Sequence, residues 1–184
     1  MTDYLTDIDA IQARVGRLPG PRDLKVIDFV DAHAARWLEH ASAAVLSIGN
    51  ATALRCTAAG GAAGFAGLRD SGTVLLNVGD VDNADLLVVG ASFGSVFLIP
   101  GKTETLRING SVDAVDDATA ELRVSECYLH CGKALLRSDF WRAEPAAGNF
   151  DDAQAFLAQC RLLVVGTIDA GGAADASPKG DPAG

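Results

Sequence analysis

The sequence predicts a mainly β protein of the α+β type, in which a barrel or sandwich of short strands is flanked by helices. Two observations carry this prediction. Residues 43–129 consist of short apolar runs separated by Gly, Asn and Asp, a pattern typical of barrels and sandwiches rather than of alternating βαβ units. Residues 4–41 and 150–159 instead place their apolar residues at helical spacing.

Length, charge and cysteine content limit the protein class. The chain has 184 residues, of which 49% are hydrophobic, and a net charge of −9, so it can bury one good core and is not expected to bind nucleic acid or an anionic membrane. No apolar run approaches the roughly 18 residues of a membrane span, and the N-terminus has no signal-peptide pattern. We therefore expect a cytoplasmic protein, with reduced thiols at Cys56, Cys127, Cys131 and Cys160.

The elements are expected in the following order. Residues 4–16 and 22–41 form two helices separated by the breaker Leu18-Pro19-Gly20-Pro21, so residues 1–42 are an N-terminal helical leader. A barrel domain spans residues 43–141, with strands at 43–48, 53–57, 73–78, 86–89, 95–99, 104–115 and 120–129. Residues 142–149, rich in Ala, Pro and Gly, form a linker.

After the linker the pattern of helix and hairpin starts again. Residues 150–159 predict a helix, and 161–168 and 173–177 predict two strands. Laid over the first copy, Val164 falls on Ala44 and Ile168 on Ile48, so residues 150–184 are a partial second repeat of residues 30–64. This segment is too short for a second barrel. Either the chain is a fragment of a longer tandem protein, which we favour, or the hairpin completes a barrel in a neighbouring chain.

Residues 128–141 concentrate the chemistry of this acidic chain. Lys133 and Arg137 are four residues apart and can converge on one anion, and Trp141 can cover a planar ring. The competing interpretation is a solvated basic helix face and a Trp that fills the core, and composition alone favours it. No metal site is predicted, because Cys127 and His130 would point to opposite faces of a strand.

Motifs in this region add a family resemblance. The tail H-C-x-K-A-L-x-R-S-x-x-W at His130–Trp141, the hairpin at 97–110 and the leader at 18–37 resemble a branch of the pyridoxamine 5'-phosphate oxidase-like, FMN-binding split-barrel family. The resemblance implies a six-stranded Greek-key split β-barrel with flanking helices, followed by the start of a second repeat. It also implies a dimer that holds FMN at its interface, with residues of both partners touching the flavin.

Differences between the two copies imply that one composite site remains. The second copy carries Ser177-Pro178-Lys179-Gly180-Asp181, similar to the family motif that approaches flavin, whereas residues 57–64 of the first copy lack the cation and the carboxylate. Residues 79–95 contain no Lys or Arg where the family usually has an Arg-rich phosphate-binding segment. By resemblance, the cofactor-binding residues are Lys133, Arg137, Ser138, Trp141, Ser177, Pro178, Lys179, Gly180 and Asp181.

Two functions follow from the resemblance. The first is an FMN-dependent oxidoreductase that acts on a small-molecule substrate as a homodimer or pseudo-dimer, with His130 as a candidate proton donor. The second is a non-catalytic, degenerate split-barrel module, which serves as a scaffold or binds a small ligand. Related barrels also hold deazaflavin or haem, so these cofactors are alternatives to FMN.

Overall fold

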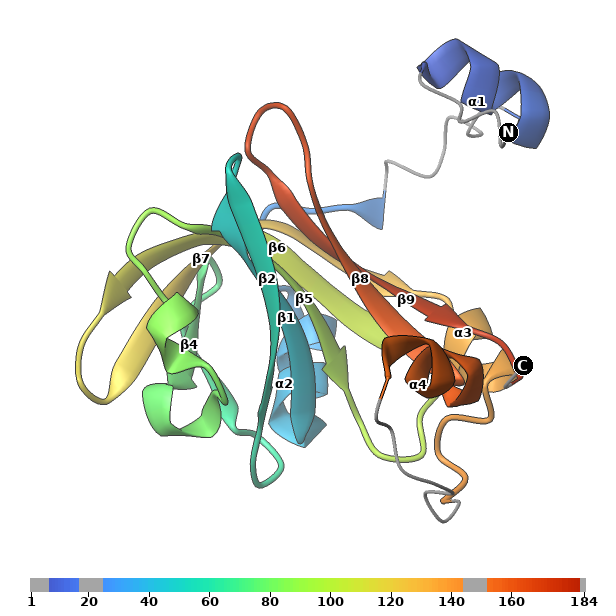
Figure 1. The fold of residues 1–184 in the computed structure, drawn as a ribbon. Coiled ribbons are helices and arrows are strands. Elements are labelled where there is room, and N and C mark those ends of the chain that lie inside the picture. Colours follow the sequence, from blue (N-terminus) through green and yellow to red (C-terminus); the bar gives the residue numbers. More distant parts are fainter. Residues whose placement is uncertain (1–6, 17–24, 144–151, 183–184) are drawn as a thin grey trace.

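The fold is mainly β, with one large antiparallel sheet. The computed structural model describes residues 7–16, 25–143 and 152–182. Seven strands form the sheet in the order β2-β1-β5-β6-β7-β4-β3 (Figure 1). They are β1 (Ala43–Asn50), β2 (Ala53–Gly60), β3 (Ala66–Asp70), β4 (Thr73–Asn77), β5 (Ser92–Leu98), β6 (Thr105–Val115) and β7 (Thr119–His130).

The remaining elements lie at the two ends of the chain and between β4 and β5. Helices α1 (Ile8–Val15) and α2 (Ala32–His40) precede the sheet, and the short helix α3 (Lys133–Arg137) follows it. Two 3-10 segments, η2 (Val78–Asp80) and η3 (Ala84–Leu86), connect β4 to β5. Helix α4 (Ala153–Gln159) leads into a separate two-stranded hairpin, β8 (Leu162–Ile168) and β9 (Ala174–Gly180).

Most predicted elements are confirmed, and three predictions are wrong. The sheet has seven strands rather than six, because residues 66–70 form β3 against β4. Residues 86–89, predicted as a strand, form the end of η3 and a turn that closes at Gly90, whose φ is +85°. The second helix begins at Ala32 rather than near residue 22, because the Asp31 side chain caps it and Ile27 instead pairs with Cys127 of β7.

The inner face of the sheet encloses the main apolar core. Phe93, Phe97, Leu46 and Leu106 are almost fully buried there. Side chains of α2, including Leu38, join the same core from the inner side of the sheet. Burial of these large side chains is the main source of stability, at about 1.5–3 kcal/mol each before entropy is counted.

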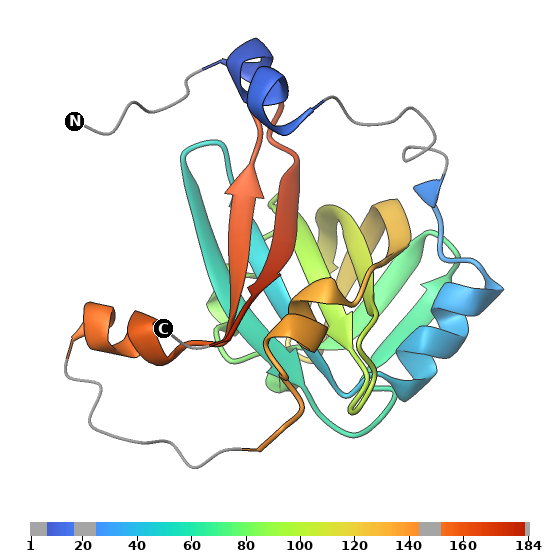
Figure 2. The ribbon, with the colours of Figure 1, turned by 90° about the vertical axis from the view of Figure 1, so that its right-hand side faces the viewer.

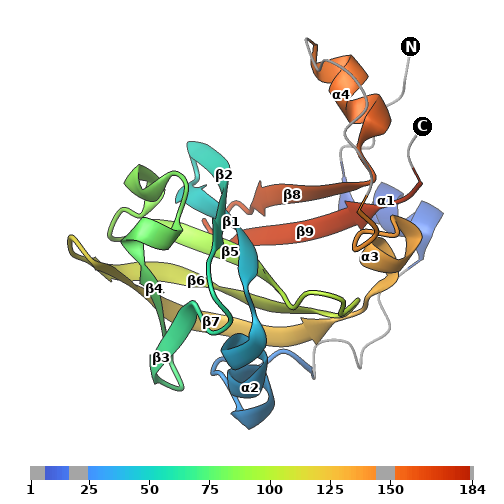
Figure 3. The same ribbon diagram turned by 90° about the horizontal axis from the view of Figure 1, so that it is seen from below.

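The hairpin β8–β9 covers the outer face of the same sheet. Figures 2 and 3 show it lying across β1 and β5, on the side of the sheet opposite α2. Ala176 of β9 packs with Val96, Leu98 and Leu135 in a second, smaller core. The sheet is therefore buried on both faces in this region, by α2 on one side and by the hairpin on the other.

The element order expected for the second copy is present. Helix α4 followed by the antiparallel pair β8–β9 repeats the order of α2 followed by β1–β2. The loops differ, since β1–β2 closes with Asn50 opposite Ala53, whereas β8–β9 closes with Ile168 opposite Ala174. Most of the predicted linker at 142–149 lies outside the described residues, and the internal repeat itself stays a prediction.

Candidate functional site

The C-terminal end of the hairpin lies against α3. A Cβ atom on Gly180 would lie 2.1 Å from the carbonyl oxygen of Ala134, so only glycine allows this close approach. Arg137 of α3 forms an ion pair with Asp181, with 3.7 Å between Nη1 and Oδ1. The two halves of the predicted composite site, far apart in sequence, therefore meet in space.

The predicted cofactor residues from α3 and its C-terminal turn divide into exposed and buried groups. Lys133 and Arg137 are exposed. Ser138 is buried, and its hydroxyl donates to the carbonyl oxygen of Leu135 at 3.1 Å. The indole N–H of Trp141 donates to the carbonyl oxygen of Lys102, and its ring meets Phe140 edge-on. Of the residues predicted in this segment, Lys133, Arg137 and the partly exposed Trp141 can therefore be reached by a ligand.

The residues from β9 also differ in exposure. Lys179 is exposed and donates to the Ser177 hydroxyl at 2.7 Å. Pro178 and Gly180 are buried against the sheet and α3. Alternation along the strand explains this split, because successive side chains of a strand point to opposite faces. Ser177 and Lys179 therefore form the face that a ligand can reach.

A second group of cations, which sequence reasoning missed, lies on the outer face of β6 and β7. The Arg107 guanidinium lies 5.3 Å from the centre of the Tyr128 ring, and Lys25 Nζ lies 5.5 Å from it. Tyr128 in turn lies 6.5 Å from the His130 ring, centre to centre. Two cations, a phenol and an imidazole are thus gathered at the end of β7 that leads into α3.

Charges around His130 alter its protonation. Burial, followed by the positive charges of Arg107 and Lys25, lowers the pKa of His130 below its ordinary value of 6.5. Lys179 of the hairpin also lowers this pKa, whereas the backbone of Cys131 opposes the shift. The neutral form of the His130 imidazole is therefore favoured at pH 7.

Of the three cations that act on His130, Arg107 has a carboxylate partner within the described residues. Arg107, whose side chain is 5% exposed, forms an ion pair with Asp175 of β9, and Asn109 also donates to that carboxylate at 3.1 Å. Within the described part of the chain, Lys25 and Lys179 form no ion pair. Lys25 contacts the Tyr128 ring and Lys179 the Ser177 hydroxyl, so neither lysine charge is neutralised by a carboxylate among the described residues.

Three of the four buried polar side-chain atoms without a partner among the described residues lie in the same place; the fourth, Trp37 Nε1, belongs to α2. Thr105 Oγ1, Arg107 Nε and His130 Nδ1 have no hydrogen-bond partner within the described residues. Thr105 is paired with His130 across β6 and β7, and Arg107 with Tyr128, so the three atoms are neighbours on the outer face. Leaving buried polar atoms unpaired costs about 1–3 kcal/mol each, a cost that functional sites accept.

The acidic segment between β4 and β5 packs along β2. Val81 pairs with Ala59, and the Asp82 amide donates to the Ala58 carbonyl at 3.0 Å. These β2 residues lie in the first-copy stretch that lacks the flavin-approaching motif. The segment that contains no Lys or Arg thus lies beside β2.

Metal-ligating groups, membrane-spanning helices and related proteins were each sought. No group of three or more metal-ligating side chains comes together within the described ranges. No helix among them is long and apolar enough to cross a membrane. Comparison with protein-family models and with curated proteins gives no match, so the family resemblance depends on the motifs quoted above alone.

Proposed function

We propose that the chain is an FMN-binding oxidoreductase that holds its flavin between α3 and the end of β9. One observation supports the proposal: β9 lies against α3, where Asp181 forms an ion pair with Arg137 and the charge of Lys179 acts on His130. In a protein of net charge −9, this gathering of cations favours an anionic ligand.

The residues present fit the anionic and planar parts of FMN. Lys133, Arg137 and Lys179 would hold the phosphate, with Arg137 supplying a planar fork and the lysines compact charges. Trp141, whose side chain is partly exposed, would cover the ring by stacking. Ser177 would contribute its hydroxyl, whereas Ser138, Pro178 and Gly180 support the site from inside.

When bound, FMN supplies two-electron redox chemistry, and the protein positions it and a small-molecule substrate. We propose that His130 accepts a proton at Nδ1 rather than donating one as the sequence suggested. Its lowered pKa leaves the imidazole neutral at pH 7, and Nδ1 has no partner within the described residues. Arg107 keeps this state by its charge, and Asp175 keeps Arg107 in place.

We also propose the finer fold and assembly that the resemblance implies. The Ala59–Val81 bridge joins β2 to the segment that follows β4, which supports a split barrel closed along this line. The hairpin would take the place of a partner's first hairpin, giving a pseudo-dimer. The four free cysteines support a reducing compartment, so we place the protein in the cytoplasm.

A second candidate function is a degenerate, non-catalytic module. The Arg137–Asp181 pair and the Arg107–Asp175 pair favour it, because both guanidinium groups already have a carboxylate partner. In this case the barrel serves as a scaffold, or holds a small ligand, deazaflavin or haem.

Titration with FMN separates the two functions. We expect FMN to bind at least tenfold more tightly than riboflavin, which lacks the phosphate, because one favourable charge contact is worth about 1.4 kcal/mol or more. Lys179→Ala should remove most of this preference, as followed by flavin absorbance and fluorescence. The matched control is Arg69→Ala, which removes an exposed cation of β3 outside the site.

Either result is informative about the assignment. Equal binding of FMN and riboflavin would contradict a phosphate site at Lys179. Absence of flavin binding by the wild-type protein would support the degenerate module, and haem and deazaflavin would then be titrated in the same way.

A further inference from the structure

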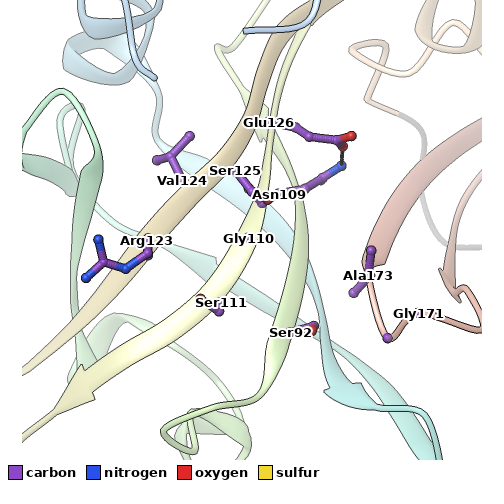
Figure 4. Close-up of a pocket in the computed structure, with 12 residues that line it drawn as sticks. Ser92, Asn109, Gly110, Ser111, Arg123, Val124, Ser125, Glu126, Gly171 and Ala173 are labelled. Atoms are coloured by element: carbon purple, nitrogen blue, oxygen red, sulfur yellow. Dashed lines mark hydrogen bonds between the residues drawn. The ribbon is translucent and has the colours of Figure 1, made fainter. Parts of the chain in front are cut away.

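A second site lies at the opposite end of the hairpin, away from α3. A cavity of about 450 Å³ lies between the outer face of β5–β7 and the loop that joins β8 to β9, and Figure 4 shows the residues that line it. Most of its lining consists of Ser, Gly and Ala. These residues are Ser92, Gly110, Ser111, Ser125, Gly171, Gly172, Ala173 and Ala174. The cavity stays open because these side chains are too small to fill it.

A β-bulge determines which charged groups reach the cavity. Glu126 pairs with Asn109, but Val124 pairs with Gly110, so Ser125 is an extra residue in β7. Without the extra residue, Arg123 and Glu126 would point to opposite faces, because side chains alternate along a strand. The bulge places both on the outer face, and bulges often re-aim side chains beside functional sites.

Only one of the two charges is available. Arg123 is held by Asp113, at 3.2 Å from Nε to Oδ1 and by a second contact through Nη2, and its side chain points away from the hairpin loop (Figure 4). Glu126 extends toward the hairpin and accepts one hydrogen bond, from the neutral Asn109 amide at 2.8 Å. No cation pairs with Glu126 within the part of the chain that the structure describes.

The other polar groups complete a set of acceptors. The hydroxyls of Ser92, Ser111 and Ser125 line the same cavity, and the Ser125 hydroxyl already donates to the Asn109 carbonyl at 3.1 Å, which leaves its oxygen free to accept. A carboxylate with hydroxyl oxygens around it matches the three N–H donors of a primary ammonium group. No aromatic side chain lines this cavity, so a ligand that requires stacking is disfavoured.

We propose that this cavity binds a small molecule bearing a primary ammonium group, with Glu126 as its counter-ion and the serine hydroxyls as further acceptors. One wall of the cavity is the hairpin loop, where Gly172 has a φ of +88°. A bound ammonium compound would therefore link the hairpin to the sheet. The proposal does not depend on flavin binding, since it uses a different end of the hairpin and different residues.

Three small probes test the proposal on the full chain without flavin. Ethanolamine carries a primary ammonium group at pH 7, ethylene glycol replaces it with a neutral hydroxyl, and choline keeps the charge without N–H donors. Backbone amide NMR shifts of Ser111, Ser125 and Gly172 should respond to ethanolamine in a saturable way. We expect ethylene glycol and choline to bind at least tenfold more weakly.

Two variants of the same strand identify the counter-ion. Glu126→Gln keeps the shape of the side chain and should weaken ethanolamine binding at least tenfold. Glu121→Gln makes the same change where the carboxylate pairs with Arg69, outside the cavity, and should leave binding within about twofold. The NMR spectra of both variants show whether each is folded.

Three results would overturn the proposal. These are no saturable shift up to about 10 mM ethanolamine, equal binding of ethanolamine and ethylene glycol, and unchanged binding in a folded Glu126→Gln variant. Each of them is independent of whether FMN binds.

Discussion

The two faces of the large sheet are buried in different ways. On the inner face, Phe93 and Leu106 pack in an apolar core with other strands of the sheet and with α2. On the outer face, the same two strands carry Gly94 and Arg107, which are covered by a hairpin from the far end of the chain. The inner face is therefore buried by a large apolar core, whereas the outer face combines a smaller apolar core with the buried ion pair of Arg107, and both depend on the docked hairpin.

The largest effect is expected from breaking the inner face. Phe93 is 1% exposed, and Phe93→Ala should lower the free energy of unfolding by about 3–5 kcal/mol, since it removes buried area and leaves a cavity. Denaturant unfolding followed by circular dichroism measures this loss. A change of under about 1 kcal/mol would mean that the inner face is not the main core.

A smaller effect is expected from pushing the hairpin off the outer face. A Cβ atom at Gly94 would lie 2.5 Å from the backbone of Asp175, so Gly94→Ala should cost about 1–3 kcal/mol. Hydrogen exchange should accelerate in β8 and β9 and stay slow in β6. The control is Gly79→Ala, where an added Cβ meets nothing within 4 Å; equal exchange in the two variants would contradict the docked hairpin.

A still smaller effect is expected from removing the charge of Asp175, where the hairpin contacts the outer face of the sheet. Asp175→Asn keeps the shape of the side chain but leaves the buried Arg107 guanidinium without a carboxylate, at a cost of about 1–2 kcal/mol. Glu121→Gln, which alters the pair with the exposed Arg69, should cost under about 1 kcal/mol. Thermal unfolding of the two variants measures the difference, which should vanish if Arg107 is solvated in the native protein.

The smallest expected effect is a pH dependence of stability that arises from His130 on the outer face. The pKa of His130 is below 6.5 in the folded protein, mainly through burial, and close to 6.5 in the unfolded chain. The unfolded chain therefore binds more protons in this range, and stability should fall as the pH drops below about 6.5. His130→Gln should flatten this dependence between about pH 7 and about pH 5. An equal slope in both proteins would place its origin elsewhere.

The fold was largely predictable because its elements follow local patterns. The apolar runs at β1, β4 and β5 were found, since each carries enough apolar residues to mark a strand. β3 was missed, because its sequence Ala-Gly-Leu-Arg-Asp has little apolar content and becomes a strand only by pairing with β4. The run at 86–89 was predicted as a strand, yet Val88 and Val89 are mostly exposed.

The candidate site was predictable only in part. Lys133, Arg137, Lys179 and Asp181 were identified by motif, and the structure brings Arg137 and Asp181 together. The Arg107–Asp175 pair joins residues 68 positions apart, and no local pattern gives such a contact. One signal was present, however, because Arg107 stands between Leu106 and Ile108 in a predicted strand, and a lone Arg there suggests a buried partner.

The pairing of Ile27 with Cys127 allows the opening of the fold to be followed by thiol chemistry. The Cys127 thiol is 1% exposed, and burial, with a smaller contribution from Asp31, raises its pKa to about 12. Alkylating reagents react with thiolate, so they reach this sulfur only after the strand that carries Ile27 lifts away or the core opens. Cys56 and Cys131 are exposed and should be labelled at once. The rate of the slow phase of thiol modification therefore reports how often the structure around Cys127 opens.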